Sequence, residues 1–337
     1  MKARGLADET RSAEQLTAVA AAFYLHGKNQ AQIAADLELS PSTVSRYLKR
    51  ARDEGIVHVE IRPPRRHHVE LGRELAGRSG LERAVVLSLE GDGEGGDALF
   101  ALAADHIGSL LRSGMRLGIS WGQTLAGVVR FLQPRAVSHL TISQLTGGLA
   151  DVEPGNQGHE LVRHLAQLYP NSRVKYLHAP AIVDSEHIHE ALMSDGSVRS
   201  ALEEAARCEL ALVGIGSMGR DATLIRAGDL SEADRAQLVQ DGAVGTLNSR
   251  FFTREGRPVR HLDQRTIALD WDQLVGIPTV VAVAAGPSKV QAIAGAARTG
   301  CLHTLITDET TARALLAIYD RRERARRPPT PPAAVRR

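Results

Sequence analysis

Aromatic residues and cysteines are scarce in this sequence. Phe, Trp and Tyr make up only 4% of the 337 residues, whereas 43% are hydrophobic, so a core has to be built from Ala, Val, Leu and Ile. The two cysteines, Cys208 and Cys301, stand far apart without a CxxC pair, which argues against a disulfide or a zinc site. We expect both thiols to be buried, and we expect no metal and no cofactor.

Long apolar runs are missing as well. No stretch approaches the roughly 18–20 uninterrupted apolar residues of a membrane span. Residues 1–15 lack the apolar core of an export signal. These absences argue against a membrane partner and predict a soluble, cytoplasmic protein.

The net charge of +2 is distributed unevenly along the chain. Counting Lys and Arg against Asp and Glu, residues 1–66 carry +3, residues 67–320 carry −7 and residues 321–337 carry +6. Cationic ends on an acidic body suggest that only part of the molecule meets a polyanion. Because a basic run is usually just a solvated face, charge alone does not decide this.

The first sixty residues predict a helix-turn-helix. Apolar residues recur at helical spacing over 15–25, and a second helix over 30–37 places Ile33, Ala34 and Leu37 on one face. Glu38 stands in the following turn, where glycine is common. A third helix then begins with Ser40 as N-cap and Pro41 at the first position, where no backbone donor is needed.

In such a motif the start of the last helix enters the major groove of DNA. Short or bidentate hydrogen-bonding side chains suit base edges, and the cations further along suit phosphates. The predicted base-reading residues are Ser42, Thr43, Ser45 and Arg46, and the predicted backbone contacts are Lys49, Arg50, Arg52 and Gln30. The alternative interpretation is a helical hairpin with a charged surface, such as a dimerisation bundle.

The domain boundaries follow from composition. Residues 56–61 alternate apolar and polar side chains, which predicts a short strand or wing before Pro63 and Pro64. We therefore predict a (winged) helix-turn-helix domain over 1–62, a linker over 63–80, an effector-binding and oligomerisation domain over 81–320, and a disordered, basic, Pro-rich tail over 321–337.

The long second domain alternates apolar runs with helical stretches. Runs that are nearly continuous in Val, Leu and Ile indicate a parallel sheet covered on both faces, and therefore a Rossmann-like α/β fold. The predicted strands lie within 83–90, 115–120, 140–148, 173–182, 208–217, 279–286 and 302–309.

Four of these runs end in loops rich in glycine and hydroxyl groups, at 118–124, 144–149, 214–219 and 284–289. Ligands of open α/β sheets bind beyond the carboxyl ends of the strands, and exposed N–H groups at helix starts suit phosphate. Lys289 and Lys175 are the only lysines among residues 67–320, and Lys289 falls in the last of these loops. We predict that Lys289 lies beside a phosphate.

Together these segments resemble the SorC family of sugar-binding transcriptional regulators. The resemblance runs from about Gln15 to Tyr319, and its marks are the helix-turn-helix segment 32–57, "GISWGQTL", "QLTGGL", "GAVGTLNSRFF" and residues 284–316. It implies a bacterial regulator of carbohydrate genes with a sugar-phosphate-isomerase-type effector domain. It also implies a phosphorylated sugar as effector, double-stranded operator DNA as partner, and a homodimer or homotetramer.

The resemblance also implies roles for single residues. Ser120, Gly122, Gln123 and Thr124 should cradle the phosphate, Lys289 should contact it, and Gln144, Gly147 and Gly148 should line the sugar. Thr246 stands where the family often has an acidic side chain, which would accept sugar hydroxyls more strongly. No arginine stands in "GIGSMG", so a monophosphate is expected rather than a bisphosphate.

An enzyme is the main alternative, a sugar-phosphate isomerase or aldolase with a DNA-binding appendage. Such chemistry needs an acid/base pair or an activated lysine. Candidates exist in Lys289, Asp221 and Asp308, but no carboxylate stands within the four loops, so we expect no catalytic residue and no enzyme. A structural scaffold is the third interpretation, and it leaves the four loops without a purpose.

Overall fold

The computed structural model describes residues 14–24, 26–57, 67–88, 95–150, 155–219 and 222–326. The chain divides into two compact units, residues 1–64 and residues 65–337, and each is described by itself. Among the described helices, none combines the length and the apolar character needed to cross a bilayer.

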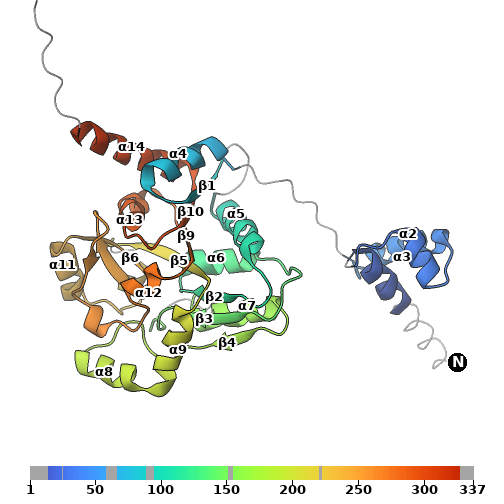
Figure 1. Ribbon diagram of the computed structural model, residues 1–337, viewed down its shortest axis with the longest axis horizontal. Helices are drawn as coiled ribbons and strands as arrows, with labels where there is room; N and C mark the ends of the chain where they lie inside the picture. The colour runs from blue at the N-terminus through green and yellow to red at the C-terminus, as the bar shows by residue number, and fades with distance from the viewer. Residues whose placement is uncertain are drawn as a thin grey trace, which may run out of the picture. The chain divides into compact units, whose positions relative to one another are not determined.

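The first unit contains the predicted helix-turn-helix (Figure 1). A helix over residues 14–24 precedes α2 (Gln30–Asp36) and α3 (Pro41–Asp53). Val19, Ile33, Ala34, Val44 and Leu48 form its core. These side chains come from all three helices, so their burial fixes the angle at which α2 and α3 meet.

The start of α3 is built as predicted. The Ser40 hydroxyl accepts a hydrogen bond from the Thr43 N–H at 3.1 Å, and Pro41 occupies the first turn. Glu38 has a φ of +52°, the left-handed conformation that the tight turn requires. One expectation is wrong: Leu37 is 41% exposed rather than buried, because it already caps α2, where the chain turns away. The predicted wing falls largely in 58–66, outside the described residues.

The second unit is built on a parallel sheet with the strand order β1-β10-β9-β5-β2-β3-β4. All seven predicted strand segments are confirmed, and every neighbouring pair in this order is parallel. The strands are β1 (Arg83–Leu87), β2 (Arg116–Ile119), β3 (Thr141–Gln144), β4 (Arg173–Lys175), β5 (Leu210–Ser217), β9 (Thr279–Val283) and β10 (Thr304–Asp308).

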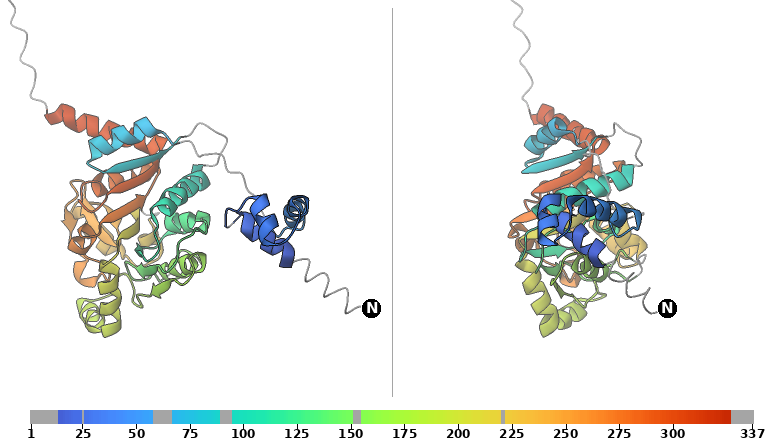
Figure 2. Two further views of the ribbon diagram at one scale, coloured as in Figure 1. Left: turned by 45° about the vertical axis from the view of Figure 1, so that its right-hand side comes forward. Right: turned by 90° about the vertical axis from the view of Figure 1, so that its right-hand side faces the viewer.

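Helices cover both faces of this sheet, as the two views in Figure 2 show. Alternate side chains of one strand point to opposite faces, so Leu210 and Leu212 join one core while Ala211 and Val213 join the other. The first core is closed by α5 (Gly95–Leu110), α6 (Gln123–Phe131) and α7 (Gly158–Leu168). The second is closed mainly by α4 (Val69–Ser79), α9 (Gly196–Ala206), α12 (Trp271–Val275), α13 (Val290–Ala296) and α14 (Glu309–Arg326).

Two predicted domain limits need correction. Residues 69–79, predicted as part of a linker, form α4, whose Leu71 and Leu75 are buried in the second core. Residues 321–326, predicted as tail, continue α14. Both segments contain many charged residues, which led to the prediction of a linker and a tail. A helix needs only one apolar face to join a core, so the charged residues are compatible with a helix. Residues 327–337 lie outside the described part.

A small antiparallel extension was not predicted. β6 (Ala243–Leu247) pairs with the end of β5, β7 (Arg250–Thr253) pairs with β6, and β8 (Pro258–Val259) pairs with β7. Asn248 and Ser249 connect β6 to β7 with φ values of +51° and +61°, as in a type I′ hairpin turn. This extension and the short helices α10 (Thr223–Arg226) and α11 (Glu232–Gln240) enclose a further apolar cluster.

Candidate functional site

The order of the sheet places a cavity at its centre. From β2 the chain moves outward to β3 and β4, whereas from β5 it moves the other way to β9 and β10. β2 and β5 are neighbours, so their carboxyl ends form the topological switch point where such sheets bind ligands. A cavity of about 220 Å³ lies there, lined by the loops after β2, β5 and β9; we call it the switch-point cavity.

This cavity brings together six of the nine residues predicted for the effector. They are Ser120, Gly122, Gln123, Thr124, Thr246 and Lys289. The prediction missed other polar residues that line the same cavity, Trp121, Ser217, Thr223, Asn248, Ser249 and Ser288. Asn248 and Ser249 could have been found in the quoted segment "GAVGTLNSRFF", since an Asn-Ser pair between apolar runs is a hairpin signal.

The start of α6 lines the cavity and has no side-chain cap. Gly122 is its N-cap with a φ of +123°, a conformation reserved for glycine, and no side chain caps the helix. Gln123 and Thr124 of the first turn line the cavity. The first N–H groups of a helix have no partner within it and carry its partial positive charge, so this end suits an anion.

Lys289 reaches the cavity from the short 3₁₀ turn η2 (Pro287–Lys289) that follows β9. Gly286 before this turn has a φ of +108°, and its N–H donates to the Thr311 hydroxyl at 2.9 Å. The hydroxyl thus ties the loop to the first turn of α14. The position of the Lys289 backbone beside the cavity is therefore fixed by this loop.

The β6–β7 hairpin forms another wall of the cavity. Asn248 is 3% exposed, and its Nδ2 donates to the carbonyl oxygen of Leu145 at 3.1 Å. The Ser249 hydroxyl lies 2.8 Å from the hydroxyl of Thr146, in the loop after β3. These bonds attach the hairpin to the parallel sheet at residues that are far away in the sequence.

Three buried polar atoms around this cavity have no hydrogen-bond partner among the described residues. They are Trp121 Nε1, Thr246 Oγ1 and Asn248 Oδ1. A buried polar atom left unpaired costs about 1–3 kcal/mol, so native proteins nearly always satisfy it with protein, water or ligand. Each of these three atoms is itself buried, so it is covered by protein atoms rather than exposed to the cavity.

The described part of the lining carries one positive side chain. Among the described residues that line the cavity, Lys289 is the only charged side chain, and there is no Asp, Glu or His. With the positive end of α6, this makes the cavity suited to one anionic group and poorly suited to a cation.

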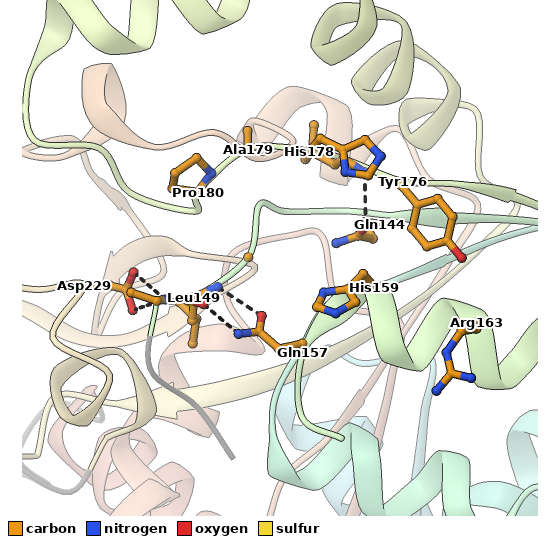
Figure 3. A pocket seen from close by; sticks show the side chains of 13 residues that line it. Gln144, Leu149, Gln157, His159, Arg163, Tyr176, His178, Ala179, Pro180 and Asp229 are labelled. Carbon is orange, nitrogen blue, oxygen red and sulfur yellow. Dashed lines mark hydrogen bonds between the residues drawn. The ribbon is translucent and has the colours of Figure 1, made fainter. Parts of the chain in front are cut away.

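The other three predicted effector residues lie elsewhere. Gln144 and Gly148 line a separate, more open cavity of about 650 Å³, which Figure 3 shows beside His159, Tyr176 and His178. Gln144 is 3% exposed, and its Oε1 accepts a hydrogen bond from the Leu177 N–H at 3.1 Å, so its amide joins β3 to the segment after β4. The sugar-lining role expected for Gln144 does not follow from this position.

Gly147 and Gly148 serve backbone packing. The Gly147 N–H donates to the Ile267 carbonyl and the Gly148 N–H to the Ala179 carbonyl, each at 2.9 Å. A Cβ added at Gly147 would lie 2.3 Å from the Pro180 carbonyl oxygen, which no real Cβ tolerates. Close approach of two backbone segments thus explains the glycine at 147, whereas an added Cβ at Gly148 would meet no backbone atom.

We expect Gly147→Ala to lower the free energy of unfolding by about 1–3 kcal/mol, because the backbone has to move apart. Gly148→Ala is the matched control, since its added Cβ would meet only the flexible Gln157 side chain, at 3.3 Å. Urea unfolding of both variants measures the difference. Equal stability of the two variants would contradict the packing role of Gly147.

The residues predicted on α2 and α3 to bind DNA differ in solvent exposure and in the bonds that their side chains already make. Gln30, Ser42, Ser45, Arg46 and Lys49 are exposed, whereas Thr43 and Arg50 are partly buried. The Ser42 and Thr43 hydroxyls each lie 2.8 Å from the Ser40 hydroxyl. Arg50 forms an ion pair of 2.7 Å with Glu54 on the same helix. Ser45, Arg46 and Lys49 are therefore exposed predicted contacts on α3 that none of these bonds engages.

Comparison with known proteins agrees with both units. Residues 64–317 match the family described as "Putative sugar-binding domain", and residues 28–59 match "Bacterial regulatory protein, arsR family". The chain is 32% identical to transcriptional regulator LsrR of Klebsiella pneumoniae, over 90% of this chain and 94% of that protein. It is 30% identical to the deoxyribonucleoside regulator of Bacillus subtilis, over 91% of this chain and 98% of that protein.

A solved full-length structure shows the same architecture. The sorbitol operon regulator SorC from Klebsiella pneumoniae superposes with a TM-score of 0.69 at 28% identity, over 90% of this chain and 98% of that one. The family match covers most of the chain. It agrees with the helix-turn-helix of the first unit and with the parallel sheet and switch-point cavity of the second. This chain belongs to the SorC-type family of sugar-binding bacterial transcriptional regulators.

Proposed function

We propose that a phosphorylated sugar binds in the switch-point cavity and thereby changes the affinity of the helix-turn-helix for its operator. One observation carries this proposal: the uncapped start of α6 and Lys289 line the same small cavity, among described lining residues that include no carboxylate. A phosphate group is the common metabolite anion that takes several N–H donors and a lysine at once.

The dimensions favour a single phosphate. The cavity measures about 220 Å³ and offers one helix start and one lysine among its described lining residues. That supports a sugar monophosphate rather than a bisphosphate. The sugar class is supported by the family, and by relatives whose names refer to sorbitol and to deoxyribonucleosides.

The same lining supports a sensor rather than an enzyme. Isomerisation or aldol cleavage needs a general base near the sugar carbons, usually His, Asp or Glu. The described lining residues include none of these; they do include Lys289, and Asp221, another candidate named from the sequence, lies outside the described residues. Incubation with each sugar phosphate, followed by ³¹P NMR, tests this: a new phosphate ester would contradict the sensor and favour the enzyme.

Thermal unfolding against a panel of sugar phosphates tests the cavity directly. The panel contains glucose 6-phosphate, fructose 6-phosphate, ribose 5-phosphate and 2-deoxyribose 5-phosphate, each beside its unphosphorylated parent. A ligand at 100 times its dissociation constant stabilises the folded state by about 2.7 kcal/mol, which raises Tm by about 5 °C or more for a unit of this size. Stabilisation by parents and esters alike would contradict a phosphate site.

Effector control requires a difference in affinity between two arrangements of the protein. A ligand shifts the equilibrium only by its differential affinity for the two states, and DNA then affects ligand binding by the same factor. We infer a homodimer or homotetramer acting in the cytoplasm. Two recognition helices of a dimer contact half-sites about 34–36 Å apart, so the operator should be roughly palindromic.

Arg46→Ala should weaken operator binding by about 10- to 100-fold, because it removes a side chain able to pair with a base edge. Lys49→Ala should instead weaken binding to all DNA sequences alike. It should also reduce the slope of the logarithm of the binding constant against the logarithm of the salt concentration by about one. Operator sequences selected from a random pool provide the probe, and titration at several salt concentrations separates the two effects. Lys28→Ala is the control, since Lys28 is paired with Asp36 at 2.7 Å.

A further inference from the structure

The loop that carries Lys289 is attached to α14 by a buried hydrogen bond. Thr311, in the first turn of α14, is 1% exposed, and its hydroxyl accepts the N–H of Gly286 at 2.9 Å. The carboxylate of Asp308 accepts the N–H of Thr311 at 2.7 Å, so this turn is also fixed to the end of β10. A change in the position of the Lys289 loop therefore acts directly on the start of α14.

The helix that follows Lys289 gives the loop a second connection to α14. α13 begins directly after Lys289 and packs against α14. Arg298, which follows α13, places its guanidinium carbon 5.1 Å from the ring centroid of Tyr319 in α14, a cation–π contact. The loop is thus joined to α14 at Thr311 and, through α13, at Tyr319.

α14 in turn lies along α4, as Figures 1 and 2 both show. Buried leucines of the two helices belong to one apolar cluster: Leu71, Leu75, Leu315 and Leu316. Arg78 at the end of α4 also forms an ion pair with Asp320 of α14. Apolar burial and this ion pair hold the two helices together.

α4 stands where the chain enters the α/β unit. His68 is its N-cap, with Nδ1 accepting the N–H of Leu71 at 3.3 Å. The backbone N–H of His68 donates to the carbonyl of Val86 in β1 at 2.8 Å. Residues 58–66, which lie outside the described residues, connect this point to the helix-turn-helix along the chain. A shift of α4 therefore acts on the residue from which the chain leads to the DNA-binding unit.

We propose that α14 and α4 transmit effector binding from the switch-point cavity to the DNA-binding unit. Thr311 is the positioning residue that links the Lys289 loop to α14. This inference rests on the proposed function, because it requires an effector that binds beside Lys289. The effector acts through this route only if it favours one arrangement of the loop and the two helices over another. The operator must then change effector affinity by the same factor.

Two variants each interrupt one step of the route. Thr311→Val removes the hydroxyl that accepts the Gly286 N–H, whereas Thr311→Ser keeps a hydroxyl at this position. Asp320→Asn removes the negative charge that pairs with Arg78, far along α14 from its first turn. The Asp320 side chain is 47% exposed, so this variant should fold even if Thr311→Val does not.

Matched controls make the same changes outside the route. Thr307→Val removes a hydroxyl on β10 that is equally buried but has no hydrogen-bond partner among the described residues. Glu70→Gln removes a negative charge that pairs with Arg73 at 2.8 Å within α4 itself. Neither change alters a bond between the cavity loop, α14 and α4.

The experiment measures effector affinity and effector control separately, with the full chain. Calorimetric titration without DNA gives the affinity for the panel member that stabilises the wild type most. Titration of the selected operator, with and without that sugar phosphate at saturation, gives two operator dissociation constants. Their ratio is the coupling factor, the number of fold by which the effector changes operator affinity.

We expect Thr311→Val to bind the sugar phosphate about 2- to 10-fold more weakly, because one hydrogen bond that positions the Lys289 loop is lost. Its coupling factor should fall by about 2- to 30-fold. Asp320→Asn should leave effector affinity within about twofold of the wild type, yet lower the coupling factor by about 2- to 5-fold. Thr311→Ser and the two controls should match the wild type in both quantities.

The outcomes separate the proposed function from this inference. If no panel member changes operator binding by the wild type, the proposed function is wrong and the inference is overturned with it. If the wild type responds and both Thr311→Val and Asp320→Asn keep its coupling factor, only the inference is overturned. Equal losses of coupling in Thr307→Val or Glu70→Gln would overturn it as well. Loss of coupling in Thr311→Val alone would overturn the part assigned to the contact between α14 and α4.

Discussion

Replacing Arg250 with methionine should lower the free energy of unfolding of the α/β unit by about 3–5 kcal/mol. The guanidinium is buried, with its side chain only 7% exposed. It donates to the carbonyl oxygens of Leu269 and Ala268 at 3.2 and 2.9 Å, and to Asp263 Oδ1 at 3.2 Å. Methionine would fill part of the space but leave these acceptors buried and unpaired.

Arg260→Met provides the control. Arg260 pairs with the same carboxylate, Asp263, at 3.4 Å, but its side chain is 76% exposed. An exposed ion pair contributes about 0–1 kcal/mol, so this variant should be nearly as stable as the wild type. Urea unfolding of both variants measures the comparison, and similar losses in the two would contradict the role assigned to burial.

The Arg250 variant should also weaken ligand binding. Arg250 follows directly on Asn248 and Ser249, and its hydrogen bonds hold β7 against residues 263–269. Burial lowers the pKa of its guanidinium, and the nearby carboxylate of Asp263 opposes this shift, so the pair keeps the cation charged. Loosening this anchor should disorder the hairpin wall of the cavity.

Lys289→Met should weaken binding of the effector by about 10- to 100-fold, because a hydrogen bond to a charged group contributes about 1.5–3 kcal/mol. Lys289 is the only cation among the described lining residues of the switch-point cavity. Methionine keeps most of the aliphatic length, so loss of charge is the main change. Calorimetric titration with the tightest-binding sugar phosphate measures the effect.

Lys175→Met is the matched control for this prediction. Lys175 is the only other lysine in residues 67–320, and it is an exposed residue of β4 that does not line the cavity. Lys175→Met changes the net charge by the same amount without altering the lining of the switch-point cavity. If both variants bound the effector equally well, general electrostatic attraction rather than a placed lysine would explain any affinity for phosphate.

The sequence predicted those parts of the fold that depend on local patterns. Ser40 and Pro41 marked the start of α3 because capping involves neighbouring residues only. The seven parallel strands were recognisable because both of their faces are buried, which demands nearly continuous apolar residues. By contrast, the strands of the β6–β8 extension are short, and β6 and β7 carry residues such as Thr246 and Arg250 that obey no simple alternation.

Within the site, the glycines in the sequence were compatible with two roles, ligand binding and close backbone packing. Gly122 and Gly147 both stand in glycine-rich loops after neighbouring strands, and the resemblance assigned both to the ligand. The structure separates them: Gly122 opens α6 at the cavity, whereas Gly147 lets the Pro180 carbonyl approach. Sequence cannot tell these uses apart, because the atom that excludes a side chain comes from a distant segment.

The sequence by itself determined the helix-turn-helix, the parallel α/β class and three of the loops that line the switch-point cavity, since these follow from capping, apolar periodicity and residues that are neighbours in the chain. The tertiary structure alone decided which loops share a cavity. It brought Trp121, Thr246 and Asn248, which come from distant parts of the sequence, into the lining of one cavity. Such coincidences arise from strand order and long-range packing, which no local pattern encodes.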